Sequence, residues 1–235
     1  MGAAKYRLHP GQIGGRYRMS GRFLAILVCG AVGMFACTLY RKKKYSLSVL
    51  QCFLFTVLLT LTGVAGAKLL FAIENGFRAW DGVSFFGSVF LIPIVMPLIG
   101  FLFRLRPNQT LDVCGPCVAV MIACLRVNCF VAGCCGGWEV CIGSLCFAWP
   151  TQIIDSFWDL LIMERMMVRE KKVPSDGKLY PMFMVGYSLM RFFLEFLRDT
   201  PKDWLLLSHG QWFSLAALLV GGVWLLLLKR RCAEQ

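Results

Sequence analysis

Seven long apolar stretches, separated by short polar or basic connections, restrict what this chain can fold into. A helix needs about 20 mostly apolar residues to span the hydrocarbon core of a bilayer. Backbone N–H and C=O groups in lipid must be satisfied within the protein, so stretches of this length predict helices. The expected segments are 23–40, 47–73, 83–103, 111–132, 150–167, 180–197 and 212–228.

We therefore predict an all-α, polytopic membrane protein of about seven transmembrane helices. The chain is 58% hydrophobic and 16% charged, whereas a soluble domain carries about a quarter charged residues. Asp155, Asp159 and Glu164 interrupt the fifth segment, which we expect to be partly interfacial. The predicted organisation is a basic N-terminal arm (1–22), a membrane domain (23–231) and a C-terminal tail (232–235).

The net charge of +12 indicates topology rather than nucleic-acid binding, because the basic residues fall between apolar segments. Cytoplasmic loops of membrane proteins collect Lys and Arg. This rule predicts a cytoplasmic C-terminus, with the N-terminus and the loop 133–149 outside; five basic residues of the N-terminal arm argue against it. The basic residues on the predicted cytoplasmic side are Arg41–Lys44, Arg104, Arg106 and Arg169–Lys178, followed by the C-terminus.

Charged residues inside apolar segments are costly and indicate a function. Lys68 and Arg126 lie in the second and fourth segments, and Arg191, Glu195 and Arg198 share one face of the sixth. An internal Arg191–Glu195 salt bridge would explain two of these charges. The excess of cations favours an anionic ligand, and a lipid phosphate is the anion available at this depth, because guanidinium groups bind phosphate through paired hydrogen bonds.

The cysteines allow more than one interpretation. Cys114-Gly-Pro-Cys117 matches a dithiol motif of oxidoreductases, but no βαβ pattern surrounds it. We interpret it as a helix start, with Asp112 as an N-terminal charge and Pro116 in the first turn. A further group occupies the Gly-rich loop and the end of the fourth segment. Its irregular spacing favours disulfides or free thiols over a metal site; its members are Cys129, Cys134, Cys135, Cys141 and Cys146.

The string from Arg126 to Gly137 resembles the signature of prolipoprotein diacylglyceryl transferases. Further similarity follows in order along most of the chain. The matching strings are Gly66-Ala-Lys68, Ser84-Phe-Phe-Gly-Ser88, Asp112 with Pro116, Trp149-Pro-Thr-Gln152 with Asp155, the Tyr187, Arg191, Glu195 and Arg198 helix, and Gly210-Gln211.

The resemblance implies a seven-helix enzyme of the bacterial inner membrane that needs no cofactor. Such an enzyme transfers the diacylglyceryl group of phosphatidylglycerol to the lipobox cysteine of a preprolipoprotein, among membrane lipids and without nucleic acid. Arg126, Arg191 and Tyr187 are the expected catalytic residues. The expected substrate-binding residues are Lys68, Cys129, Gly137, Gln152, Glu195 and Arg198.

The chain departs from the family pattern at three polar positions. Phe86 and Trp149 replace histidines, and Cys129 replaces an asparagine. Phenylalanine cannot carry a proton, so the identity of the general base and of the acceptor remains open. Two alternatives therefore stand beside the transferase: a membrane thiol-disulfide oxidoreductase using Cys114 and Cys117, and a non-catalytic phospholipid-binding homologue.

Overall fold

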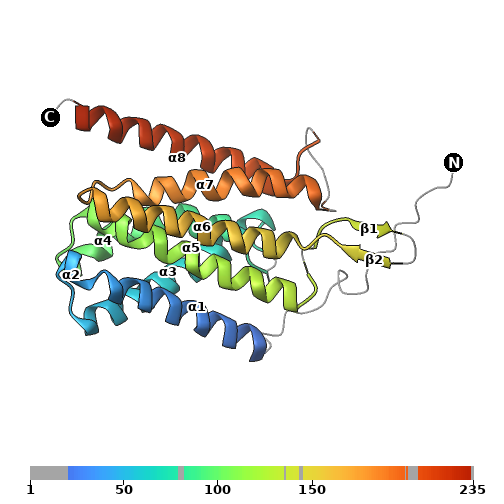
Figure 1. Ribbon diagram of the computed structural model, residues 1–235, viewed down its shortest axis with the longest axis horizontal. Coiled ribbons are helices and arrows are strands. Elements are labelled where there is room, and N and C mark those ends of the chain that lie inside the picture. The colour runs from blue at the N-terminus through green and yellow to red at the C-terminus, as the bar shows by residue number, and fades with distance from the viewer. Residues whose placement is uncertain are drawn as a thin grey trace.

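The computed structural model describes residues 21–78, 82–134, 136–142, 145–198, 200 and 206–233. Most of the predicted N-terminal arm, Cys135 and the last two residues of the predicted C-terminal tail lie outside these ranges. The described chain is a bundle of long helices that run roughly along one common axis (Figure 1). Its helices are α1 (Gly21–Tyr40), α2 (Lys42–Tyr45), α3 (Val49–Glu74), α4 (Phe85–Gly100), α5 (Pro107–Val131), α6 (Thr151–Lys172), α7 (Leu179–Leu194) and α8 (His209–Ala233).

Each of the seven predicted segments overlaps one of the long helices. Short 3-10 helices, η1 (Phe101–Phe103) and η2 (Glu195–Leu197), extend α4 and α7. Within the described chain, four helical segments are long and apolar enough to cross a membrane: α3, α4 with η1, α5, and α8. Many large apolar side chains on these helices are exposed, as expected for a protein surrounded by lipid.

Helix α5 lies at the centre of the bundle and packs against α1, α4, α6 and α7. Most of its membrane-length stretch is buried inside the protein. Helix α8 lies along one side of the bundle, mainly against α7 (Figure 1). Side chains that α5 contributes therefore meet those of α6 and α7 in the interior.

One short antiparallel hairpin departs from the predicted all-α class. Its strands, β1 (Glu139–Ile142) and β2 (Leu145–Ala148), project beyond one end of the helices (Figure 1). Cys141 lies opposite Cys146 in the hairpin register, and Cys141 is disulfide-bonded. Cys129 and Cys134, in contrast, are not disulfide-bonded.

Prolines inside the helices leave backbone carbonyls without their usual helical partner, because proline has no N–H. Pro93 in α4 would have donated to the carbonyl of Val89. The buried Tyr180 of α7 donates its hydroxyl to this carbonyl at 2.9 Å. The tyrosine hydroxyl and the carbonyl, both costly to bury alone, thus satisfy each other.

Helix α5, which corresponds to the fourth predicted segment, begins earlier than the sequence pattern predicts. It starts at Pro107, which occupies the first helical position, so Pro116 lies in the helix interior. The prediction that Pro116 stands in the first turn is therefore wrong. Asp112 does not cap its own helix either: its carboxylate accepts the backbone N–H groups of Gly177 and Leu179, each at 3.0 Å.

Candidate functional site

Three arginines and one aspartate meet in the interior near the hairpin end of the bundle. Arg126 comes from the last turns of α5 and Asp155 from the second turn of α6. The Asp155 Oδ2 atom lies 2.7 Å from Arg126 Nε and 3.6 Å from Arg191 Nη1. The same oxygen lies 3.9 Å from Arg198 Nη2. One fully buried carboxylate thus draws together cations from three parts of the chain.

Arg126 uses different faces of its guanidinium group for different partners. Its Nε faces Asp155, and its Nη2 donates to the Tyr187 hydroxyl at 3.1 Å. The guanidinium carbon also lies 4.9 Å from the centre of the Phe85 ring. A planar cation with several donors makes such divergent contacts, whereas a single ammonium group does not.

Glu195 holds the other two arginines from the opposite side. Its Oε2 atom lies 3.3 Å from Arg191 Nη2 and 3.8 Å from Arg198 Nη1. Its other oxygen accepts the Ser208 hydroxyl at 3.1 Å, just before α8. The Arg191–Glu195 ion pair considered from the sequence alone is therefore present, but as part of a larger network.

The Gly-rich loop that follows α5 is fastened over this cluster. The Gly137 N–H donates to the Trp149 carbonyl at 3.0 Å, and the Trp138 N–H donates to the Leu197 carbonyl at 2.9 Å. The Gln152 amide also donates to the Cys134 carbonyl at 2.6 Å. Gly137 forms an isolated bridge with Arg198, so the loop and the end of η2 share backbone contacts.

A side chain at position 137 would not fit. A Cβ atom on Gly137 would lie 2.6 Å from the Leu197 carbonyl oxygen and 2.7 Å from the Trp149 Cβ. Rotating a flexible side chain cannot relieve these contacts, because a carbonyl oxygen and a Cβ atom are both fixed by the backbone. The glycine at this position is therefore required by the close approach of the loop to η2.

Seven of the nine predicted site residues belong to one contiguous group. They are Arg126, Gly137, Gln152, Tyr187, Arg191, Glu195 and Arg198. Cys129 is buried one turn after Arg126 and interacts electrostatically with it. Lys68 is half-buried on α3, a helix that packs mainly against α4 and α1. The roles of these nine residues stay predictions.

The two positions where the family pattern has histidine differ in their surroundings. Phe86 is buried, with its ring centre 5.6 Å from that of Tyr187 and 5.9 Å from that of Phe213. It packs with apolar contacts against the Tyr187 ring. Trp149 is exposed beside the hairpin. Neither residue can supply an acid or a base to the cluster.

Sequence analysis did not assign a role to Asp155 or Asp159. Their four-residue spacing places them on one helical face, but in a segment that we expected to be partly interfacial. Both carboxylates are 0% exposed, and they point into the protein. The signal available was the similarity of Asp155 to a family glutamate, together with three arginines that needed a counter-charge.

The Cys-Gly-Pro-Cys string lies far from this cluster along α5 and has a structural explanation. Pro116 leaves the Asp112 carbonyl without a helical donor. Arg41 supplies one: its Nη1 donates to the Asp112 carbonyl at 3.0 Å, and its Nη2 to the Val113 carbonyl at 2.7 Å. Cys114 and Cys117 are both 0% exposed. A dithiol that exchanges with protein substrates needs an accessible thiolate, so this placement does not favour an oxidoreductase.

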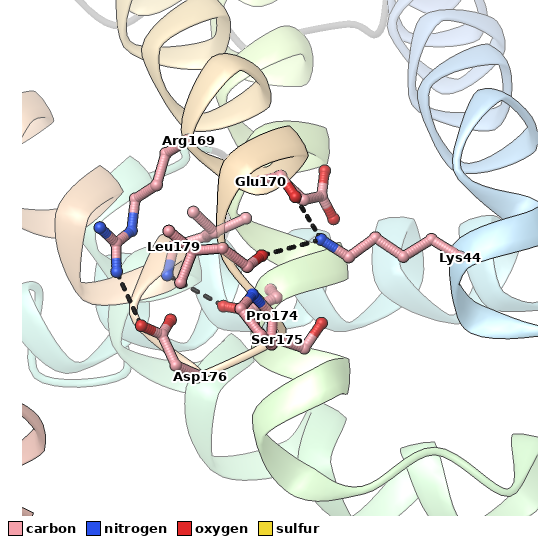
Figure 2. Close-up of a pocket in the computed structure, with 9 residues that line it drawn as sticks. Lys44, Arg169, Glu170, Pro174, Ser175, Asp176 and Leu179 are labelled. Carbon is pink, nitrogen blue, oxygen red and sulfur yellow. Dashed lines mark hydrogen bonds and ion pairs between the residues drawn. The ribbon is translucent and has the colours of Figure 1, made fainter. Parts of the chain in front are cut away.

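Charges at the end of the bundle opposite the hairpin pair with one another around a small pocket (Figure 2). Lys44 reaches from α2 to the carbonyls of Glu170 and Val173, and Arg169 pairs with Asp176 at 2.7 Å. Burial raises the pKa of Asp176, but Lys178 and Arg169 outweigh it, so the net pKa lies below its ordinary value. These contacts fasten the α6–α7 connection to α2.

Comparison with known proteins identifies the family of this chain. Residues 22–227 match the family model described as prolipoprotein diacylglyceryl transferase. The chain belongs to this family. The match covers every residue of the arginine cluster and the hairpin.

Individual proteins with the name of this family are also similar to the chain. A Clostridium perfringens protein named phosphatidylglycerol–prolipoprotein diacylglyceryl transferase 2 is 30% identical over 192 residues, which cover 72% of this chain and 75% of the relative. A Clostridium tetani transferase is 28% identical over 204 residues, covering 77% and 82% of the two chains. One from Polaromonas naphthalenivorans is 29% identical over 167 residues, covering 63% and 61%.

Proposed function

We propose that this chain is an enzyme that transfers the diacylglyceryl group of phosphatidylglycerol to a cysteine thiol of a prolipoprotein. The family and the names of the relatives support the donor, the acceptor and the reaction. The observation that carries the proposal is the cluster of three arginines inside an apolar bundle. Buried cations beyond those needed for internal pairing suit a phosphate anion.

The chemistry follows from the position of the charges. The acceptor thiolate attacks the glyceryl carbon that carries the phosphate, and glycerol phosphate leaves. Negative charge on the phosphate increases as the carbon–oxygen bond breaks. Arg126 and Arg191 are proposed to stabilise this charge from fixed positions, an effect that contributes strongly to catalysis when the donors are preorganised. Tyr187 is proposed to contact the same phosphate beside Arg126.

The remaining site residues are proposed to hold the two substrates. Arg198 and Glu195 fix the position of Arg191, while the loop at Gly137 and Gln152 closes over the cluster. The lipobox peptide is proposed to enter beside this loop. The full proposed substrate-binding set is Lys68, Cys129, Gly137, Gln152, Glu195 and Arg198.

We propose a multi-pass position in the bacterial plasma membrane, with seven spans, the N-terminus outside and the C-terminus cytoplasmic. Helix α2, the α6–α7 connection and the end of α8 lie together at one end of the bundle (Figure 1), and these segments carry many of the basic residues. The positive-inside rule favours this end as cytoplasmic. The disulfide-bonded Cys141 lies at the opposite end, and disulfides persist in oxidising compartments.

The test is a reconstituted transfer reaction. Purified protein in detergent is mixed with phosphatidylglycerol and a synthetic lipobox peptide, and mass spectrometry follows the peptide. We expect the peptide mass to increase by one diacylglyceryl group, and an Arg126→Ala variant to produce no such product. A folded, unsubstituted chain that binds phosphatidylglycerol but gives no product would contradict the proposal and favour a non-catalytic lipid-binding protein.

A second variant separates the transferase from the thiol oxidoreductase. Because Cys114 and Cys117 are buried inside α5, replacing both by serine should leave most of the transfer intact. Disulfide exchange with a reporter peptide serves as the parallel measurement. Exchange that depends on these two cysteines, in a preparation without lipid product, would favour the oxidoreductase.

A further inference from the structure

Asp159 is a buried acidic side chain to which no group in the described part of the chain donates a hydrogen bond. It lies on α6, one helical turn after Asp155, and it is 0% exposed. Within the described chain neither of its carboxylate oxygens accepts a hydrogen bond, and it takes part in no ion pair. Burial penalises an ionised carboxylate strongly when no donor compensates it. The neutral carboxylic acid is therefore the stable form of this side chain in the substrate-free protein.

The charges around Asp159 favour a neutral acid when the donor lipid is bound. Arg126, Arg191 and Arg198 carry three positive charges, and Asp155 and Glu195 pair with them through two negative ones. One positive charge is left over. A phosphodiester carries one negative charge and balances the site only if Asp159 is protonated.

The groups that face Asp159 come from each helix that packs against α6. Arg126 of α5 and Arg191 of α7 interact with it electrostatically, as does Asp155 on its own helix. Tyr187 of α7 also lies within electrostatic range. Asp159 therefore lies beside both arginines to which we assign the lipid phosphate.

The charge balance of the site changes when the donor lipid is cleaved. The departing phosphate gains a second negative charge, while the arginine cluster still offers only one unpaired positive charge. We propose that Asp159 enters the reaction as a neutral carboxylic acid and donates its proton to the departing glycerol phosphate. This inference rests on the proposed transferase function and names the acid that Phe86 and Trp149 cannot provide.

The step is balanced in atoms and electrons. The sulfur electron pair of the acceptor forms the carbon–sulfur bond, and the electron pair of the carbon–oxygen bond leaves with the phosphate. The Asp159 proton passes to a phosphate oxygen, so that glycerol phosphate departs as a monoanion. The proton released by the acceptor thiol restores the acid for the next cycle. No additional reactant is needed.

Asp159→Asn is the decisive variant, because asparagine keeps the size and the neutrality of the protonated acid but carries no transferable proton. We expect phosphatidylglycerol affinity to stay within about twofold. Transfer should fall by about a hundredfold or more, the range that general acid catalysis contributes. Asp159→Glu should recover part of the rate, and Glu164→Gln, on an exposed turn of the same helix, should leave the rate unchanged.

The pH dependence separates proton donation from a merely structural role. A proton donor acts below its pKa and is lost as the pH rises above it. The ratio of unsubstituted to Asp159→Asn rates should therefore decrease with rising pH. A ratio that stays constant across the pH range would overturn the inference, as would an Asp159→Asn variant with normal transfer.

An infrared measurement tests the inference without any turnover. The unsubstituted protein should show a protonated carboxyl band that is absent from Asp159→Asn. Adding glycerol phosphate should remove this band, and adding phosphatidylglycerol should preserve it. A band that is missing, or that survives saturating glycerol phosphate, contradicts proton donation. If the band behaves as expected in a chain that transfers no lipid, only the proposed transferase function fails.

Discussion

Arg126 and Arg191 each make contacts that require a branched, planar cation. Arg126 bonds Asp155 and Tyr187 at once, and Arg191 bridges Asp155 and Glu195. A lysine keeps the positive charge but presents one nitrogen on a flexible chain. In this cluster the geometry of the donors, as well as their charge, determines whether a phosphate is bound in the correct place.

We predict that Arg126→Lys and Arg191→Lys each remove most diacylglyceryl transfer, by about a hundredfold or more, while the proteins still insert and fold. Arg198→Lys should have a milder effect, because its contacts with Asp155 and Glu195 are the longest, at 3.9 and 3.8 Å. Transfer rates of purified variants that elute as folded proteins provide the measurement. If the Arg191–Glu195 pair were only structural, Arg191→Lys would stay nearly as active as the parent.

The Gly-rich loop provides a second prediction at the residue scale, with a matched control at the neighbouring residue. Gly137→Ala should reduce transfer by about a hundredfold, since a displacement of about 1 Å at a reacting site has effects of that size. Gly136→Ala should be nearly neutral, because its nearest neighbour would lie at 3.6 Å. Equal losses in the two variants would show that the close contact with η2 does not matter.

At the residue scale, sequence reasoning identified the cations of the cluster but missed its central anion. Charged residues in apolar segments stand out because each needs a reason, which led to Arg126, Arg191 and Glu195. Asp155 and Asp159 lie in a predicted segment that contains further charged residues. A helix with one water-exposed side explained these carboxylates equally well. Only the packing of α6 against α5 and α7 shows that these carboxylates face inward.

At the scale of a helix, Arg41 acts as a replacement donor for a backbone that proline has interrupted. Its guanidinium group satisfies the carbonyls of Asp112 and Val113 and pairs with Glu170 at 3.5 Å. The sequence predicts a helix at Cys114-Gly-Pro-Cys117, but it does not predict that Pro116 lies in the interior of that helix. The polar residues Asn108 to Thr110 concealed the first turn of α5, because they lack the apolar character used to delimit a span.

This arrangement predicts a coupling between two residues that are distant in sequence. Arg41→Met should destabilise the protein by about 1–3 kcal/mol, the usual cost of leaving a buried polar group unsatisfied. In a Pro116→Ala background the restored N–H of residue 116 satisfies the Asp112 carbonyl, so the same Arg41 substitution should cost less. A double-mutant cycle of unfolding in detergent measures the difference. An identical cost in both backgrounds would show that Arg41 does not serve this carbonyl.

At the scale of the whole molecule, the two ends of the bundle differ in chemistry. The hairpin end holds the arginine cluster, the Gly-rich loop and the disulfide-bonded Cys141. The opposite end holds α2 and the α6–α7 connection, where Lys44 and Arg169 make their contacts (Figure 2). The sequence predicted this separation because helices that cross a bilayer place alternate loops on alternate sides. It missed the hairpin, since each of its strands is only four residues long.

This separation leads to a prediction about topology. If the basic end faces the cytoplasm, a cysteine introduced beyond Ala233 should react with a thiol reagent in broken cells but not with an impermeant reagent in intact cells. Trp138→Cys, on an exposed residue beside the hairpin, should react in both. Because the chain contains 12 native cysteines, the unsubstituted protein must be labelled in parallel and its signal subtracted. Labelling of the C-terminal cysteine by the impermeant reagent in intact cells would reverse the orientation and place the arginine cluster at the cytoplasmic face.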